Sequence, residues 1–375
     1  MNFNLQEEQD MLKKTARDFL TNRCPKTLVR EMEEDERGYP TELWQEIADL
    51  GWTGLVFPEK YGGGGMSFLD LVLLIEEMAR ACLPSPFFAT VVLSGLAMLD
   101  AGTEEQKQAY LSQVSSGKSI FTLALYEGET QHEVGSIATT ATAKNDHFII
   151  NGTKLFVPNA HVADQILYIT RTNRQTGNGV TVFIVDAKSP GISNKVLDTI
   201  AKDKLCEVTF DEVRVSKDNI LGQRGIDLNV MQGIIERAVV AKCCEIVGYS
   251  QQMLEMTIDY AKERRQFDRA IGSFQIIQHY CSNMLTDVEG LRLSAYQAAW
   301  RLSEGLSATR EVAVAKAWAS EAGERIISLG HQIFGAMGVT NDHDLHLYTR
   351  RIKAAQLTFG DADFYHEVLA QDMGL

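Results

Sequence analysis

The spacing of apolar residues changes twice along the chain, and this change constrains the fold more than any other feature. Residues 1–118 carry apolar positions at the three-to-four-residue spacing of amphipathic helices. Residues 119–222 carry short runs rich in β-branched and aromatic residues, which are typical of strands. Helical spacing then returns in long segments nearly free of Pro. The pattern predicts an α+β multidomain protein: an N-terminal helical domain (1–118), a middle β-barrel or sandwich domain (119–222) and a C-terminal four-helix bundle (223–375).

Individual elements can be predicted inside these blocks. Ser67 and Thr103 are suitable N-cap residues for two of the helices in the first block. The Asn151-Gly152 pair between two strand-like runs predicts a hairpin turn. The predicted helices cover residues 5–22, 41–50, 68–81, 88–101, 104–116, 228–264, 273–304 and 309–334, with a last helix from Asp361. The predicted strands cover residues 148–150, 154–157, 165–170, 180–185 and 207–215.

Charge and cysteine content exclude several classes of protein. The formal net charge is -14 and no long run of Lys or Arg occurs, so nucleic acid is not an expected partner. The longest apolar stretches, such as residues 71–75, are far shorter than a membrane span, and the N-terminus lacks an apolar signal core. We therefore expect no membrane association and a cytoplasmic location. The six cysteines have neither zinc-site nor disulfide-framework spacing, which predicts reduced thiols and no metal site.

Two motifs in the last block carry a resemblance to a known family. Residues 260–267 read YAKERRQF and residues 331–338 read HQIFGAMG. They resemble the Tyr-x-x-x-Arg-x-Gln-Phe helix pattern and the Gln-x-x-Gly-Gly-x-Gly turn of the acyl-CoA dehydrogenase family. Four further segments are similar to family text: FNLQEEQDMLKKTARDFL, LGWTGLVFPEKYGGGG, FIINGTKLFVPNAHVAD and VTFDEVRVSKDNILG. The resemblance therefore covers essentially the whole chain.

The resemblance implies an FAD-dependent dehydrogenase that converts an acyl-CoA to the 2,3-enoyl-CoA and passes electrons to an electron-transfer flavoprotein. The chemistry agrees, because no side chain accepts a hydride and a flavin must do so. A carboxylate is the usual base for the α-proton. In the family the thioester oxygen is polarised by a flavin hydroxyl and a backbone amide. A homodimer or homotetramer is implied, since the flavin site of the family is shared between subunits.

The resemblance also assigns flavin-binding residues in the last block. Arg264 corresponds to the arginine that reaches the flavin pyrophosphate of a neighbouring subunit, although taken alone it reads as a solvated charge. Phe267 and Gln275 correspond to residues at the adenosine end, and Asp268 replaces the usual Gly after the Phe. In the second motif the residues that correspond to the close backbone approach are Gln332, Gly335 and Ala336.

The middle block supplies the rest of the expected flavin site. Phe156 stands at the aromatic wall beside the isoalloxazine, and Pro158 stands where the family commonly has a hydroxyl that reaches the flavin N5. Leu123 and Tyr126 belong to the segment TLALYEGE, which occupies the place of the family's flavin-cradling Thr-Glu-Pro loop.

The catalytic base is less clear, because Phe359 occupies the glutamate position of the family's Tyr-Glu-Gly-Thr turn. The position of a second family solution falls at Ala238. Glu236 and Glu245 lie on either side of Ala238 in sequence, nine residues apart and hence on opposite faces of one helix. Asp361 is a third candidate. Glu245 is read equally well as a paired structural carboxylate.

The missing glutamate leaves two other functions open. One is a non-catalytic or flavin-sharing subunit of a heteromeric dehydrogenase, which would assemble with a paralogous chain. The other is a flavin oxidase or monooxygenase on the same fold. The acyl chain of the substrate is not specified by the sequence.

Overall fold

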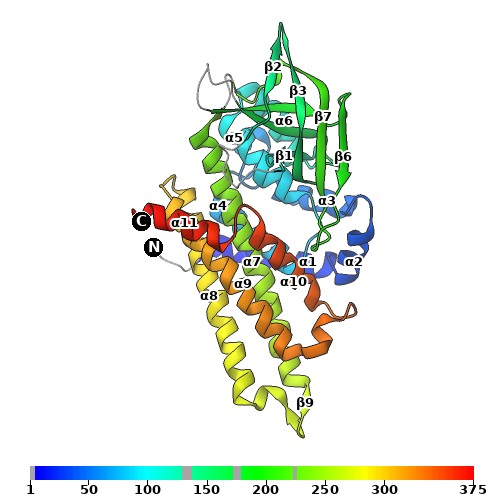
Figure 1. Ribbon diagram of the computed structural model, residues 1–375. Coiled ribbons are helices and arrows are strands. Elements are labelled where there is room, and N and C mark those ends of the chain that lie inside the picture. The colour runs from blue at the N-terminus through cyan, green and yellow to red at the C-terminus, as the bar shows by residue number, and fades with distance from the viewer. Residues whose placement is uncertain (1–4, 129–136, 172–178, 223–225) are drawn as a thin grey trace. The chain divides into compact units, whose positions relative to one another are not determined.

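The computed structural model describes residues 5–128, 137–171, 179–222 and 226–375 (Figure 1). The chain forms two compact units. The helical unit consists of Met1–Arg30, Ser67–Leu83 and Val239–Leu375. The mixed unit consists of Glu31–Met66 and Pro84–Ala238. Across the described residues, no helix combines the length and the apolar character that crossing a membrane requires.

The helical unit is built on long helices that lie side by side (Figure 1). Helix α9 has the predicted bounds, whereas α10 was not predicted. A two-stranded hairpin of β9 and β10 joins α7 to α8. The helices are α1 (Glu7–Arg23), α4 (Phe68–Ala81), the part of α7 (Leu228–Glu263) from Val239 onward, α8 (Gln275–Ser303), α9 (Thr309–Phe334), α10 (Leu345–Leu357) and α11 (Ala362–Asp372).

Helix α4 is buried along most of its length, and its buried residues include Asp70 and Glu76 besides the apolar side chains. It begins at Ser67, whose hydroxyl accepts the Asp70 amide while the Asp70 carboxylate accepts the Ser67 amide, so the predicted cap is confirmed. Helix α7 crosses α4 at Gly248. A Cβ atom added there would lie 2.1 Å from the Glu76 carbonyl oxygen, so only glycine permits this close approach.

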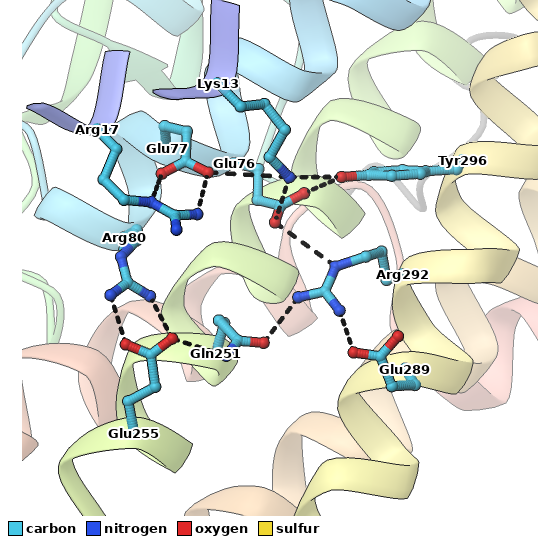
Figure 2. Close-up of polar contacts among 10 residues, drawn as sticks. All are labelled: Lys13, Arg17, Glu76, Glu77, Arg80, Gln251, Glu255, Glu289, Arg292 and Tyr296. Carbon is cyan, nitrogen blue, oxygen red and sulfur yellow. Dashed lines mark hydrogen bonds and ion pairs between the residues drawn. The ribbon is translucent and has the colours of Figure 1, made fainter. Parts of the chain in front are cut away.

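The carboxylates of Glu76 and Glu77, near the end of α4, form the polar centre of the helical unit, and Glu77 pairs with Arg17 of α1 at 2.7 Å (Figure 2). The Glu76 side chain is buried, and its carboxylate lies 2.9 Å from Lys13 Nζ of α1 and 3.6 Å from Arg292 Nε of α8. The Tyr296 hydroxyl of α8 also donates to it. Burial alone would raise the pKa of Glu76, but Lys13, Arg292 and Tyr296 outweigh it, so the pKa lies below the ordinary 4.5.

The same network extends to α7. Arg80 of α4 pairs with Glu255 through two hydrogen bonds. Gln251 donates to Glu255 at 2.8 Å and accepts from Arg292 at 2.7 Å, so it links the two arginines (Figure 2). Side chains of α1, α4, α7 and α8 thus share one continuous set of charge-assisted hydrogen bonds.

The mixed unit contains two four-stranded sheets, ordered β1-β4-β5-β8 and β2-β3-β7-β6. Residues of both sheets share one apolar core, in which the rings of Tyr168 and Phe210 stack at 4.0 Å. The strands are β1 (Phe121–Ala124), β2 (Ala141–Lys144), β3 (His147–Pro158), β4 (Gln165–Arg171), β5 (Gly179–Asp186), β6 (Ile192–Val196), β7 (Leu205–Ser216) and β8 (Ile226–Asp227). Helices α3 (Thr41–Asp49), α5 (Leu96–Ala101) and α6 (Glu104–Ser115), and the π-helical η3 (Phe88–Gly95), belong to the same unit, and α2 (Lys26–Glu34) leads into it.

The hairpin turn predicted at Asn151-Gly152 is wrong, because β3 continues through both residues. The register against β7 shifts there, and the Asn151 amide bonds the Glu212 side chain at 2.7 Å and its backbone amide at 2.6 Å. A Cβ atom on Gly152 would lie 3.0 Å from Thr139, so this glycine serves packing. The β2–β3 hairpin turns instead at Asn145-Asp146, where Asn145 has φ 49°.

We expect Gly248→Ala to destabilise the protein by about 1–3 kcal/mol, because the new methyl group overpacks the crossing of α4 and α7. Gly233→Ala in the same helix is the matched control, since no atom lies within 4 Å of its added Cβ. That control should be neutral or up to about 1 kcal/mol more stable, as expected from helix propensity. Urea denaturation of both variants measures the difference. Equal stabilities would contradict the close crossing.

We expect Glu76→Gln to cost about 3–5 kcal/mol at pH 7, because it leaves buried cations without their carboxylate. The exposed pair between Lys353 and Glu324 is the control, and Glu324→Gln should cost less than about 1 kcal/mol. Since the folded pKa of Glu76 is depressed, its contribution is fully present above pH 4.5 and is lost as pH falls through the folded pKa. Urea titrations at several pH values should therefore show the cost of Glu76→Gln shrinking below pH 4.5.

Candidate functional site

In the mixed unit, the expected flavin-facing residues lie on two hydrogen-bonded segments. Leu123 is buried in β1, and the Tyr126 carbonyl that follows this strand accepts the Leu155 amide at 2.9 Å. The Thr122 hydroxyl donates to the Pro158 carbonyl at 2.5 Å. The structure thus brings the Tyr126 segment and the end of β3 together.

Phe156 occupies an irregular position in β3. The register against β7 shifts between Lys154 and Val157, and Phe156 has a left-handed φ of 55°. Its ring is 55% exposed, whereas Val157 beside it is buried. A large apolar residue in this conformation is an outlier that is typical of binding sites.

In the helical unit, Arg264 and Phe267 belong to the hairpin between α7 and α8. The Arg264 carbonyl accepts the Ile271 amide at 2.8 Å, and β9 (Arg265–Gln266) pairs with β10 (Arg269–Ala270). Phe267 and Asp268 form the turn with φ 53° and 63°, as a two-residue type I′ turn requires. Asp tolerates this conformation, so Asp268 replaces the family's glycine without loss of the turn.

This hairpin presents an aromatic ring to solvent. Phe267 is 86% exposed and meets Phe274 edge to face at 6.1 Å between centroids. The Arg269 guanidinium lies 4.0 Å from the Phe274 ring centroid. Gln275, at the start of α8, is exposed as well.

The second motif forms the end of α9 and a 3-10 turn, η7 (Gly335–Val339). Gln332, Gly335 and Ala336 are exposed. Gly335 has φ 59°, and no atom lies within 4 Å of a Cβ built on it. The rings of Tyr260 and Phe334 stack at 4.4 Å, so the two sequence motifs meet within one unit.

These residues fit the parts of FAD that the resemblance assigns to them. Gly335 leaves its backbone uncovered for close approach of a phosphate or a ring. The exposed Phe156 and Phe267 rings offer apolar faces for stacking. When bound, FAD would supply the hydride acceptor that no side chain provides.

The three candidate bases have different surroundings. Glu245 pairs with Lys242 at 2.8 Å, and its side chain is 15% exposed. Asp361 accepts the Phe364 amide at 3.1 Å and so caps α11. Glu236 is buried in the mixed unit, on the first part of α7.

Phe359 is buried in the turn where the family commonly has glutamate, with φ 62°. Its carbonyl accepts the Tyr365 hydroxyl at 2.9 Å. Ala238, the alternative position, is also buried. Neither position holds a proton acceptor.

Sequence reasoning missed one pair beside the Tyr126 segment. Lys154 is fully buried in β3, and its Nζ lies 2.7 Å from the Glu127 carboxylate. The available signal was the alternation of β3, which turns Lys154 inward between Thr153 and Leu155.

Comparison with known proteins finds similarity over nearly the whole chain. Residues 6–118, 122–213 and 224–374 match the N-terminal, middle and C-terminal domains of acyl-CoA dehydrogenase. A 3-(aryl)acrylate reductase from Clostridium sporogenes is 29% identical over 98% of both chains. A glutaryl-CoA dehydrogenase from Desulfococcus multivorans is 30% identical over 99% of this chain and 98% of its own. The structure of butyryl-CoA dehydrogenase from Megasphaera elsdenii has 29% identity and a TM-score of 0.91 over 100% of both chains.

These similarities confirm the predicted α+β architecture and the class of enzyme. FAD is the cofactor of this family, and solved structures of the same fold include one with FAD, so the predicted cofactor is confirmed too. The matches extend over nearly the full length, as the sequence motifs indicated. The chain belongs to the acyl-CoA dehydrogenase family of flavin-dependent oxidoreductases.

Proposed function

We propose that this protein uses FAD to oxidise an acyl-CoA thioester to the 2,3-enoyl-CoA and passes the electrons to an electron-transfer flavoprotein. The observation that carries the proposal is the exposed Phe156 ring, held in a left-handed conformation beside the Tyr126 segment. Such a ring supplies a wall for the isoalloxazine. The relatives support this reading, since one is named a glutaryl-CoA dehydrogenase. Another is named a 3-(aryl)acrylate reductase, which makes reduction the competing direction.

The two ends of FAD are assigned to different surfaces in this proposal. Phe156, Pro158, Leu123 and Tyr126 contact the flavin end. Arg264 binds the pyrophosphate carried by a neighbouring subunit, because a guanidinium makes bidentate contacts with phosphate. The residues that contact the adenosine end are Phe267, Gln275, Gln332, Gly335 and Ala336. A site shared in this way requires a homodimer or a homotetramer.

For the base we propose Glu245 ahead of Glu236 and Asp361. Glu245 is almost enclosed by protein and lies seven residues from Ala238, which is nearly the same face of α7. Lys242 holds one carboxylate oxygen at 2.8 Å. Asp361 already serves as a helix cap, which occupies an oxygen with a backbone amide.

A second function is favoured by the buried Phe359. With no carboxylate at the Phe359 position, the chain would serve as a flavin-sharing subunit that assembles with a paralogous chain. That partner would supply the base, and this chain would supply flavin contacts.

We expect the protein expressed alone to be yellow and to bleach when an acyl-CoA is added without oxygen. Straight, branched and cyclic acyl-CoAs should be tested by stopped-flow absorbance. Glu245→Gln should slow bleaching by roughly 10²–10⁴-fold, the usual contribution of a general base. Glu236→Gln and Asp361→Asn, measured in parallel, should change it little. A flavin that binds and never bleaches would instead support the heteromeric subunit. Recovery of the yellow colour when a 2,3-enoyl compound is added to the chemically reduced flavin, with no bleaching by any acyl-CoA, would support a reductase.

We expect Arg264→Lys to weaken FAD binding roughly tenfold or more, because a bidentate charge-assisted contact contributes about 1.5–3 kcal/mol. Arg310→Lys is the control, since Arg310 is an exposed arginine of α9 paired with Asp372. Titration of the FAD-free protein with FAD gives both affinities. Equal affinities for the two variants would argue against a phosphate contact at Arg264.

A further inference from the structure

We propose that the buried pair of Lys154 and Glu127 positions the two flavin-facing segments of the mixed unit, and so sets both FAD affinity and the environment of the flavin. Neither residue touches the cofactor in this proposal. Each acts through its neighbours, Phe156 and Tyr126. The inference rests on the proposed assignment of those neighbours to the flavin.

Lys154 forms hydrogen bonds with the segment that follows β1. Its Nζ donates to the Leu125 carbonyl at 3.1 Å and to the Glu127 carboxylate at 2.7 Å. Glu127 also accepts the backbone amides of Ala138 at 2.9 Å and Thr139 at 3.1 Å. One ion pair therefore joins three stretches of chain, at residues 125–127, 138–139 and 154.

The pair also adjoins the irregular end of β3. Lys154 directly precedes the register shift that turns Phe156 outward, and Leu155 bonds the Tyr126 carbonyl. The Tyr168 ring covers the ammonium group at 5.4 Å. Because Lys154 and Leu155 both bond the segment of residues 125–127 just before Phe156, we infer that the orientation of Phe156 depends on the pair.

Burying the Lys154–Glu127 ion pair costs desolvation free energy that an apolar pair would not cost. Burial lowers the pKa of Lys154, an effect that Glu127 partly offsets. Burial alone would raise the pKa of Glu127, but the hydrogen bonds from Lys154, Thr139 and Ala138 bring it to about 2. Apolar residues of similar volume would pack as well, and buried ion pairs can instead select one geometry. We infer that the role of this ion pair is to fix the relative positions of the Tyr126 segment and the end of β3.

The test compares Lys154→Met and Glu127→Gln with the wild-type protein. Each variant is first checked for folding by far-ultraviolet circular dichroism, below its melting temperature. FAD affinity is then measured by titration, and the bound flavin is examined by visible absorbance and visible circular dichroism. We expect at least a tenfold loss of affinity and a changed flavin spectrum in both variants.

Lys13→Met is the matched control. Lys13 is a second largely buried lysine paired with a buried glutamate, but it lies in the network of Figure 2 in the helical unit. This variant should lose stability and keep the wild-type flavin spectrum. If Lys154 contributed only to stability, Lys154→Met would also lose stability and keep the wild-type flavin spectrum.

Wild-type affinity and spectrum in a folded Lys154→Met protein would overturn the proposal. If Lys154→Met does not fold, Glu127→Gln decides, because it keeps the size and an acceptor oxygen; an unchanged affinity and spectrum there would overturn the proposal as well. A wild-type protein that binds FAD but is not bleached by any acyl-CoA would refute dehydrogenation alone. A wild-type protein with no FAD affinity would refute both assignments.

Discussion

The helical unit depends on a charge that is buried where an apolar residue would be expected. Glu76 lies near the end of α4, a largely buried helix, and it is neutralised by Lys13 of α1 and Arg292 of α8. The observed arrangement of these helices places both cations, at 2.9 and 3.6 Å, within reach of the Glu76 carboxylate. A misaligned helix would leave a buried charge unpaired, which costs several kcal/mol. The network therefore specifies the geometry of the helices more than it adds to their stability.

This network also helps to explain why the compact units of the structure combine segments that are far apart in the sequence. Helices α1 and α4 belong to the N-terminal part of the sequence, but they form one compact unit with α8 to α11. Apolar spacing shows which face of each helix is buried and cannot show which helix covers it. The partners of Lys13 are more than 60 residues away, and no local pattern predicts such a contact.

Local patterns succeeded where the physics is local. The Ser67 and Thr103 caps and the bounds of α9 follow from residues within a few positions of each other. The Asn151-Gly152 turn failed because a non-local partner, Glu212, satisfied the asparagine side chain inside a continuous strand. Lys154 was missed for a related reason: lysine is read as a surface residue, and its buried acceptor Glu127 lies 27 positions away. Phe156 and Phe267 were assigned to the flavin only through the family resemblance, and their exposure was not predicted, since exposure of an aromatic ring is not a local property.

The turn around Phe359 keeps a strained backbone conformation although Phe359 itself cannot accept a proton. A left-handed conformation at a bulky residue costs of order 1–3 kcal/mol and persists only where the surroundings enforce it. Here Tyr365 holds the Phe359 carbonyl, and the buried Lys316 donates to the Ala355 and Gln356 carbonyls at the end of α10. Burial lowers the pKa of Lys316 to about 8, and the nearby Cys243 partly offsets this effect. Burying the charged form of this lysine therefore costs free energy. The chain thus retains a strained turn that carries no carboxylate at Phe359. Under the proposed dehydrogenation, the α-proton would then go to another side chain, such as Glu245 on α7, or to a partner subunit.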